Sequence, residues 1–126
     1  DAVQRRPDFF AAAVPICGGG DKRLGGKISK LPIWAWHGDK DTVIKPSRSR
    51  DMIEAIRENG GKPKYSEIEG RGHNSWVDCW KSEKMWLGSI HKEKNKVYCF
   101  RLFQDILAPH IKYTFEVKKR RIFNLA

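Results

Sequence analysis

Apolar runs and their polar boundaries predict the strands in the first part of the chain. The run FFAAAVPIC at 9–17 ends in three glycines, and LPIWAWHG at 31–38 ends in one. Uninterrupted apolar runs of this length, bounded by glycine, are typical of strands buried on both faces of a parallel sheet. The segment KPKYSEIEG at 62–70 alternates instead, which predicts a third strand nearer the sheet edge.

Two further stretches have the spacing of amphipathic helices. The first follows Pro46, ends at NGG (59–61), and has an apolar face formed by Met52, Ile53, Ala55 and Ile56. Proline suits the first turn of a helix and glycine its end. The second, at 74–90, carries Trp76, Val77, Trp80, Met85 and Trp86. The order of strand, loop, strand, helix, strand and helix predicts an α/β fold with three mostly parallel strands and flanking helices.

The pattern changes after residue 90. Residues 91–126 allow a helix over 98–108 and a strand over 111–117, but no turn residues connect them to the preceding elements. We therefore divide the chain into an α/β part at 1–90 and a basic tail of unknown structure at 91–126.

The charge distribution bears on the candidate partners. The net charge is +10; residues 1–75 carry 14 Lys and Arg against 10 Asp and Glu, and residues 76–126 carry 11 against 5. Such a tail could contact phosphates of nucleic acid or anionic lipid. No aromatic-interleaved nucleic-acid module accompanies it, so we expect a solvated tail rather than either partner. No apolar run is long enough to span a membrane, and the sequence does not indicate a cellular location.

Three widely spaced cysteines, Cys17, Cys79 and Cys99, form no Cys-x-x-Cys pair. Their odd number argues against a complete disulfide framework and against a structural zinc site. We expect free thiols, with Cys17 buried in the first strand.

Ionisable residues follow the second and third predicted strands, in HGDKD and GRGH. Parallel sheets gather functional groups at the carboxyl ends of their strands, so Asp39 or Asp41 is expected beside His73. A carboxylate fixes the tautomer of an adjacent imidazole and stabilises its charged form, as a general base requires. His37 is interpreted as a structural residue that hydrogen-bonds the turn. The simpler alternative for His73 is a loop residue without a chemical role.

Together these segments resemble the C-terminal part of α/β-hydrolases, nearest to the esterase and peptidase branch related to dienelactone hydrolases and prolyl oligopeptidases. In that branch, His-Gly-x-x-Asp carries the acid of the catalytic triad and Gly-x-Gly-His carries its base. The segment RRPDFFAAAVPICGGGD also resembles the one that follows the nucleophile-bearing helix. The resemblance covers about residues 4–90 and implies Asp41 as the acid and His73 as the base.

The triad nucleophile of that branch lies in Gly-x-Ser-x-Gly at a strained strand-to-helix turn. None of the serines has this context: Ser29, Ser47, Ser49, Ser66, Ser75, Ser82 and Ser89. Cys17 precedes three glycines, but Pro15 and Ile16 stand before it and a loop follows, so we do not assign it as the nucleophile. The resemblance also implies that the oxyanion-hole donors belong to the absent half.

The resemblance thus implies a C-terminal fragment of a serine hydrolase, of carboxylesterase or peptidase type, that supplies the acid and base of a Ser-Asp-His triad. Its partners would be the missing N-terminal half and, in the complete protein, a small ester or peptide substrate. No metal or organic cofactor is implied, because an acyl-enzyme route uses none. Trp76 is a candidate for lining the substrate cleft, with a core position as the simpler alternative. The first strand would have an open edge. A non-catalytic basic binding module is the alternative function.

Overall fold

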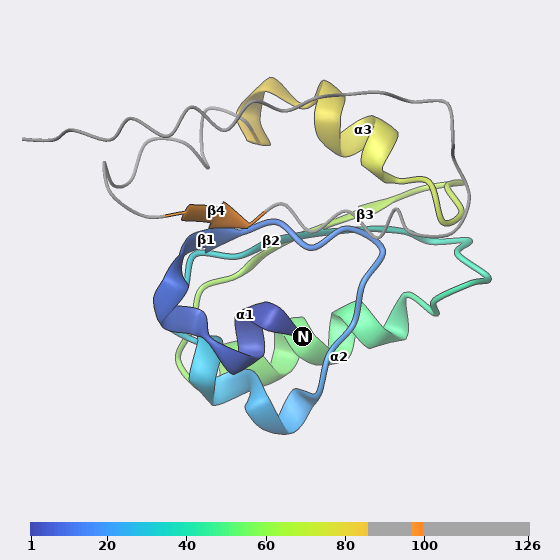
Figure 1. The fold of residues 1–126 in the computed structure, drawn as a ribbon. Helices are drawn as coiled ribbons and strands as arrows, with labels where there is room; N and C mark the ends of the chain where they lie inside the picture. The colour runs from blue at the N-terminus through green and yellow to red at the C-terminus, as the bar shows by residue number, and fades with distance from the viewer. Residues whose placement is uncertain (86–96, 100–126) are drawn as a thin grey trace, which may run out of the picture.

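Parallel strands form the middle layer of the computed structural model, which describes residues 1–85 and 97–99 (Figure 1). These residues include β1 (Phe10–Ala13), β2 (Trp34–Gly38), β3 (Lys64–Ile68) and β4 (Val97–Cys99). β1 pairs with β4, and β2 pairs with β3 in a register that runs from Trp34 opposite Lys64 to Gly38 opposite Ile68. Single bridges, Ala13 to Ile33 and Ile16 to Trp36, connect β1 to β2.

Helices cover both faces of this layer. The helical elements are α1 (Ala2–Arg5), η1 (Pro7–Phe9), η2 (Lys22–Ile28), α2 (Ser47–Glu58) and α3 (Trp76–Lys81), where η marks a 3₁₀ helix. α1, η2 and α2 lie on one face of the sheet and α3 lies on the other (Figure 1). The predicted order of elements and the parallel pairing are therefore confirmed for the described residues. Within them, no helix has both the length and the apolar character needed to cross a membrane.

The first strand is shorter than predicted. Pro15 has no N–H to donate to a neighbouring strand, and β1 ends two residues before it. The Pro15 carbonyl still accepts a hydrogen bond of 2.9 Å from the Trp36 amide, so the chain stays beside β2. Cys17, predicted within the strand, is buried but lies beyond its end.

The outer edge of β1 is not open, contrary to our expectation. Phe10, Ala12 and Ala13 are paired with residues 97–99, which form β4. The helix predicted over 98–108 is therefore wrong at its first two residues, because sheet pairing overrides local preference there. The rest of that helix, the strand predicted at 111–117 and the remainder of the tail lie outside the described residues.

The last predicted helix is interrupted. α3 ends at Lys81, Ser82 has extended backbone angles, and a helical turn resumes at 83–85. The Ser82 hydroxyl accepts a 3.3 Å hydrogen bond from the Met85 amide, so it acts as a new cap. Residues 86–90 of the prediction lie outside the described part.

Two apolar clusters hold the layers together. The cluster that includes the α3 side consists of Val14, Ile16, Cys17, Trp36, Cys79 and Met85, with Trp34, Ile68, Trp76 and Trp80 against it. The cluster on the α2 side consists of Ala13, Ile28, Ile33, Met52 and Ile56, with Val3 and Leu31 against it. The four residues of the predicted apolar face of α2 are all buried. The apolar runs 9–17 and 31–38 contribute residues to both clusters, as expected for strand segments that are covered on both faces of a sheet.

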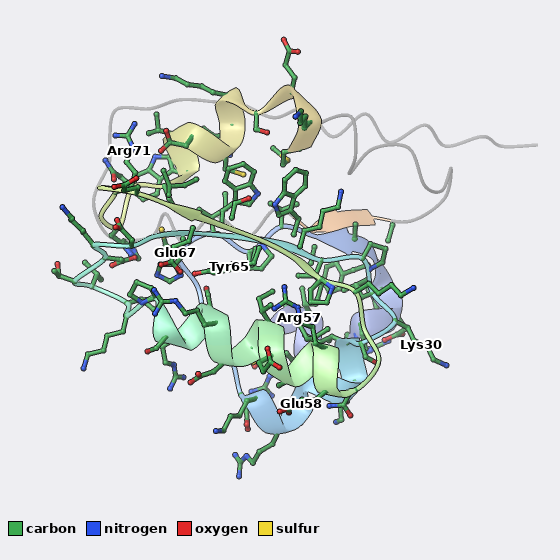
Figure 2. The ribbon with its side chains drawn as sticks, turned by 180° about the vertical axis from the view of Figure 1, so that it is seen from behind. Lys30, Arg57, Glu58, Tyr65, Glu67 and Arg71 are labelled. Carbon is green, nitrogen blue, oxygen red and sulfur yellow. The ribbon has the colours of Figure 1, made fainter. Side chains whose placement is uncertain are left out.

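An ion pair connects α2 to β3 across the surface. The Arg50 guanidinium donates two hydrogen bonds to the Glu67 carboxylate, and the Tyr65 hydroxyl donates a third over 2.7 Å. Figure 2 shows Tyr65 and Glu67 adjacent on the strand. The hydrogen bonds from Arg50 lower the pKa of Glu67 from 4.5 to about 2, against the opposing effect of burial. Burial, followed by the contact with Glu67, raises the pKa of Tyr65.

This pair predicts a loss of stability in acid. The pKa of Glu67 is lower in the folded chain, so its contribution is fully present above the ordinary value of 4.5 and is lost as the pH falls towards about 2. We expect the free energy of unfolding to decrease over that interval and Glu67→Gln to weaken the decrease. Denaturant titrations of both proteins at several pH values measure it. Parallel pH profiles for the two proteins would contradict the assignment.

Candidate functional site

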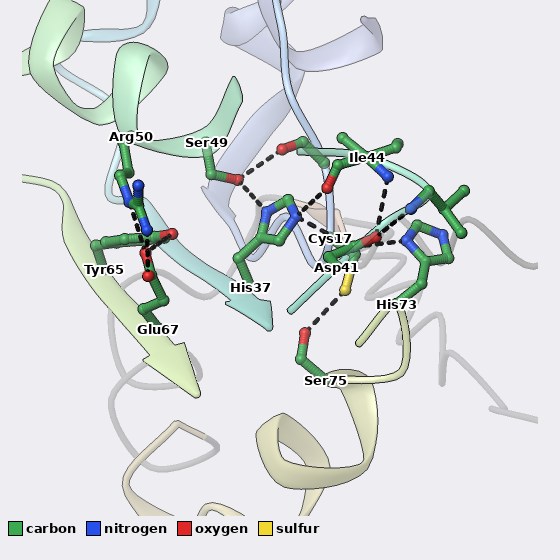
Figure 3. Close-up of polar contacts among 12 residues, drawn as sticks. Cys17, His37, Asp41, Ile44, Ser49, Arg50, Tyr65, Glu67, His73 and Ser75 are labelled. Carbon is green, nitrogen blue, oxygen red and sulfur yellow. Dashed lines mark hydrogen bonds and ion pairs between the residues drawn. The ribbon is translucent and has the colours of Figure 1, made fainter. Parts of the chain in front are cut away.

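The buried carboxylate of Asp41 lies where the loops after β2 and β3 meet (Figure 3). Its Oδ1 accepts hydrogen bonds of 2.9 Å from the amides of Val43 and Ile44. Its Oδ2 lies 2.8 Å from Nδ1 of His73 and 3.1 Å from Nε2 of His37. Four nitrogens therefore surround one carboxylate, which compensates for its removal from water.

These contacts keep Asp41 ionised. Burial by itself would raise the pKa of the carboxyl group. The hydrogen bonds from the Ile44 amide, His73 and the Val43 amide outweigh burial, and together they hold the pKa of Asp41 below its ordinary value. A carboxylate that stays charged in this position can stabilise a positive charge on an adjacent imidazole.

The turn that carries His73 is held directly against the end of β2. The amides of Asp39 and Lys40 donate to the carbonyls of Ile68 (3.1 Å) and Arg71 (2.9 Å). Gly70 has φ +72°, a left-handed conformation that glycine adopts without steric cost and that lets the chain reverse after β3.

Gly38 permits this close approach. A Cβ atom at Gly38 would overlap the backbone carbonyl oxygens of Arg71 and Gly72. Backbone atoms cannot move aside as the end of a flexible side chain can. The glycine after His37 is therefore a steric requirement for the position of His73.

His73 is oriented as a base. With Nδ1 facing the carboxylate of Asp41, the proton belongs on Nδ1, and Nε2 is left with a free electron pair. The side chain is 23% exposed, and no residue within 1–85 forms a hydrogen bond with Nε2. The indole ring of Trp76 stands edge-on to the imidazole, with centroids 6.3 Å apart. Nε2 of His73 is therefore left accessible, and the Trp76 ring lies beside the imidazole.

The structure brings the predicted site residues together. Asp41, rather than Asp39, contacts His73, and Oδ1 of Asp39 has no hydrogen-bond partner in the described part of the chain. Trp76 lies beside His73 and packs partly against the α3-side core. The roles of Asp41 and His73 as acid and base, and of Trp76 in substrate binding, stay predictions.

His37 does more than hydrogen-bond a turn. It is fully buried, with Nδ1 2.7 Å from the Ser49 hydroxyl and Nε2 2.9 Å from the Ile44 carbonyl. The Ser49 hydroxyl also donates a 2.6 Å hydrogen bond to the carbonyl of Gly18. These contacts connect the loops after β1 and β2 to the first turn of α2.

Sequence reasoning missed Ser49, although a signal was present. Ser49 precedes Met52 and Ile53 by three and four residues, so it lies on the predicted apolar face of α2. A polar residue on a buried face needs a partner, and here the partner is His37.

Cys17 completes the site on the side of β1. Its sulfur lies 2.9 Å from the Ser75 hydroxyl, and both residues are buried. Burial raises the pKa of the Cys17 thiol, although the contacts with Ser75 oppose the shift. Ser75 occupies the N-cap position of α3, yet its side chain forms no capping hydrogen bond and faces the thiol instead.

We predict that Gly38→Ala displaces the turn carrying His73. The added methyl group overlaps two carbonyl oxygens, and overpacking of this kind costs about 1–3 kcal/mol. The matched control is Gly18→Ala, whose Cβ would meet only ordinary contacts of 3.8 and 3.9 Å. Chemical denaturation should show a clear loss for the first variant and little change for the second. Equal unfolding midpoints would be inconsistent with steric control by Gly38.

We also predict energetic coupling between His37 and Ser49. His37→Ala removes one of the two partners of the Ser49 hydroxyl and one of the four nitrogens around the carboxylate of Asp41, a loss of about 1–3 kcal/mol. Because His37 and Ser49 touch, the double variant with Ser49→Ala should lose less stability than the sum of the single variants. Unfolding measurements on the four proteins test this, and strictly additive losses would argue against it.

Comparison with known proteins indicates the fold. No protein-family model and no curated protein matches the sequence. The chain is similar to the crystal structure of a thermostable esterase, with a TM-score of 0.70 and 32% identity, over 74% of this chain and 27% of that one. It is also similar in fold to esterase PE8, with a TM-score of 0.53 and 23% identity, over 64% of this chain and 39% of that one. The chain thus spans well under half the length of either protein. The described residues have an α/β-hydrolase-like fold, which they share with parts of these esterases.

Proposed function

We propose that this chain is the acid- and base-bearing part of a serine hydrolase of carboxylesterase or peptidase type. The observation that carries the proposal is the 2.8 Å contact between Nδ1 of His73 and a buried, ionised Asp41. The similarity to esterases supports the reaction class. The closer relation to dienelactone hydrolases and prolyl oligopeptidases rests on the sequence motifs around these residues.

The proposed chemistry is acyl transfer to a serine. Nε2 of His73 takes the proton of a seryl hydroxyl as the oxygen attacks an ester or peptide carbonyl, and then protonates the leaving group. Asp41 keeps the imidazole in the required tautomer and stabilises its charged form. Trp76, edge-on to His73, would line the cleft for a small ester or peptide substrate.

The nucleophile would come from a segment outside these 126 residues, which contain no Gly-x-Ser-x-Gly sequence. An apolar cavity of about 320 Å³ supports the idea that a further segment packs against these residues. Its lining includes Gly18, Gly19 and Gly20 after β1, together with Ile33, Met52 and Ile56. A helix that follows a nucleophile could bury its apolar face in this space.

The alternative, a basic binding module, rests on the tail, of which only 97–99 are described.

A chimera tests the proposal. Residues 1–90 replace the matching part of the thermostable esterase, which supplies its own remaining segments. We expect hydrolysis of a p-nitrophenyl ester, with Asp41→Asn lowering kcat about 10⁴-fold because the imidazole loses its tautomer control. His73→Gln should lower kcat at least as much. The 126-residue chain alone should not react with a fluorophosphonate serine probe.

The matched control is Asp39→Asn, two residues from Asp41. Because Asp39 does not contact His73, its substitution should leave kcat within a few-fold of the unmodified chimera. Circular dichroism verifies that each chimera is folded. A folded chimera that is active with Asn at 41, or that loses activity only with Asn at 39, would rule out the proposed acid.

A further inference from the structure

Three side chains that can coordinate a metal converge at the carboxyl edge of the sheet (Figure 3). The sulfur of Cys17, a carboxylate oxygen of Asp41 and a ring nitrogen of His73 all lie within 4.8 Å of one another. They come from three separate loops, after β1, β2 and β3. We propose that these residues form a binding site for a thiophilic divalent cation, represented by Zn²⁺ or Cd²⁺.

The ligand set favours such an ion over Mg²⁺ or Ca²⁺. Zinc binds thiolate, imidazole and carboxylate, at about 2.3, 2.0–2.1 and 2.0–2.2 Å, whereas magnesium and calcium prefer oxygen alone. Two ligands of a tetrahedral zinc ion lie roughly 3.5 Å apart, as these bond lengths require. The longest separation in the cluster must therefore shorten by about 1 Å. An ion can reach the cluster from the side of His73, because this side chain is partly exposed.

The position of Cys17 is held by its backbone. Its φ of +48° lies in the left-handed region, which residues other than glycine adopt at a steric cost. The Cys17 amide donates a 2.8 Å hydrogen bond to the Trp36 carbonyl, and the next carbonyl, of Gly18, accepts from Ser49. These anchors fix the strained residue on both sides, so the sulfur stays beside the two other ligands.

Coordination must replace the proton of the thiol. When the ion binds, the S–H bond of Cys17 breaks, a sulfur–metal bond forms and the proton passes to the solvent. The coordinating nitrogen of His73 carries no proton: Nε2 already has a free electron pair, whereas coordination at Nδ1 requires its proton to move to Nε2. Burial keeps the thiol protonated without the ion, but the charge of a bound cation reverses this preference. The Ser75 hydroxyl, 2.9 Å from the sulfur, can then donate a hydrogen bond to the thiolate.

An ion at this position would compete with catalysis. It would occupy the carboxylate and a ring nitrogen of the acid–base pair, so His73 could no longer take a proton from a nucleophile. This inhibitory consequence rests on the proposed function, whereas metal binding rests only on the three side chains. The two ideas can therefore fail independently.

The test is a titration of the 126-residue chain with Cd²⁺, with the cysteines kept reduced by a phosphine. We expect an ultraviolet thiolate-to-cadmium charge-transfer band that saturates at one equivalent, with proton release reported by an indicator dye. Mg²⁺ should produce neither signal nor competition. The band should be lost in Cys17→Ser, and His73→Ala should weaken binding by at least about tenfold.

The matched control is the double variant Cys79→Ala and Cys99→Ala, in which Cys17 is the remaining cysteine. It should retain the band and the proton release, because the proposed ligands are Cys17, Asp41 and His73. Circular dichroism establishes the folding of each variant. If Cys17→Ser does not fold, the result for His73→Ala, at a partly exposed position, decides. A band that persists without Cys17, disappears in the double variant or is unchanged in His73→Ala would overturn the proposal.

Discussion

The buried charge of Asp41 is the constraint on which the arrangement of the site depends. A carboxylate removed from water costs several kcal/mol unless donors surround it. Here the amides of Val43 and Ile44 come from the loop of Asp41 itself. His37 comes from the carboxyl end of β2, and His73 comes from the turn after β3. Satisfying this one group therefore fixes the conformation of its loop and the orientation of two imidazoles.

The same constraint accounts for the backbone between the strands. His73 reaches Asp41 only because its turn lies directly against the end of β2, where Gly38 leaves room for two carbonyl oxygens. Hydrogen bonds from Asp39 and Lys40 hold the turn at that distance. An ion pair between Arg71 and Asp78, with a closest separation of 2.7 Å, extends this attachment to α3. The geometry of the Asp41–His73 pair and the packing of these loops are thus one feature of the molecule.

The chemistry that suits a proton-transferring pair also suits a soft metal. An ionised carboxylate and a neutral imidazole with a free nitrogen are ligands as well as acid and base. The Cys17 thiol favours metal binding, because its sulfur adds a third potential ligand to the pair of Asp41 and His73. In these proposals the protonated thiol would leave the pair of Asp41 and His73 undisturbed, and only the metal-bound thiolate would engage it.

The sequence by itself determined the layered α/β order and the placing of His73 beside Asp39 or Asp41. Both follow from local patterns: glycine-bounded apolar runs read as buried strands, and ionisable groups directly after such strands meet at one sheet edge. The resemblance of HGDKD to the acid motif of α/β-hydrolases additionally favoured Asp41 as the acid. Local patterns did not separate Asp39 from Asp41 on physical grounds, because both follow the same strand.

Only the tertiary structure decided which groups touch. The contact of His73 with Asp41, the clash that forbids a side chain at Gly38, the bond of Ser49 to His37 and the approach of Cys17 to the pair all join residues from separate segments. The pairing of β4 with β1 is equally non-local, and it replaced a predicted helix at its first residues. Such contacts depend on how elements pack across the sheet, and no spacing within one segment encodes them.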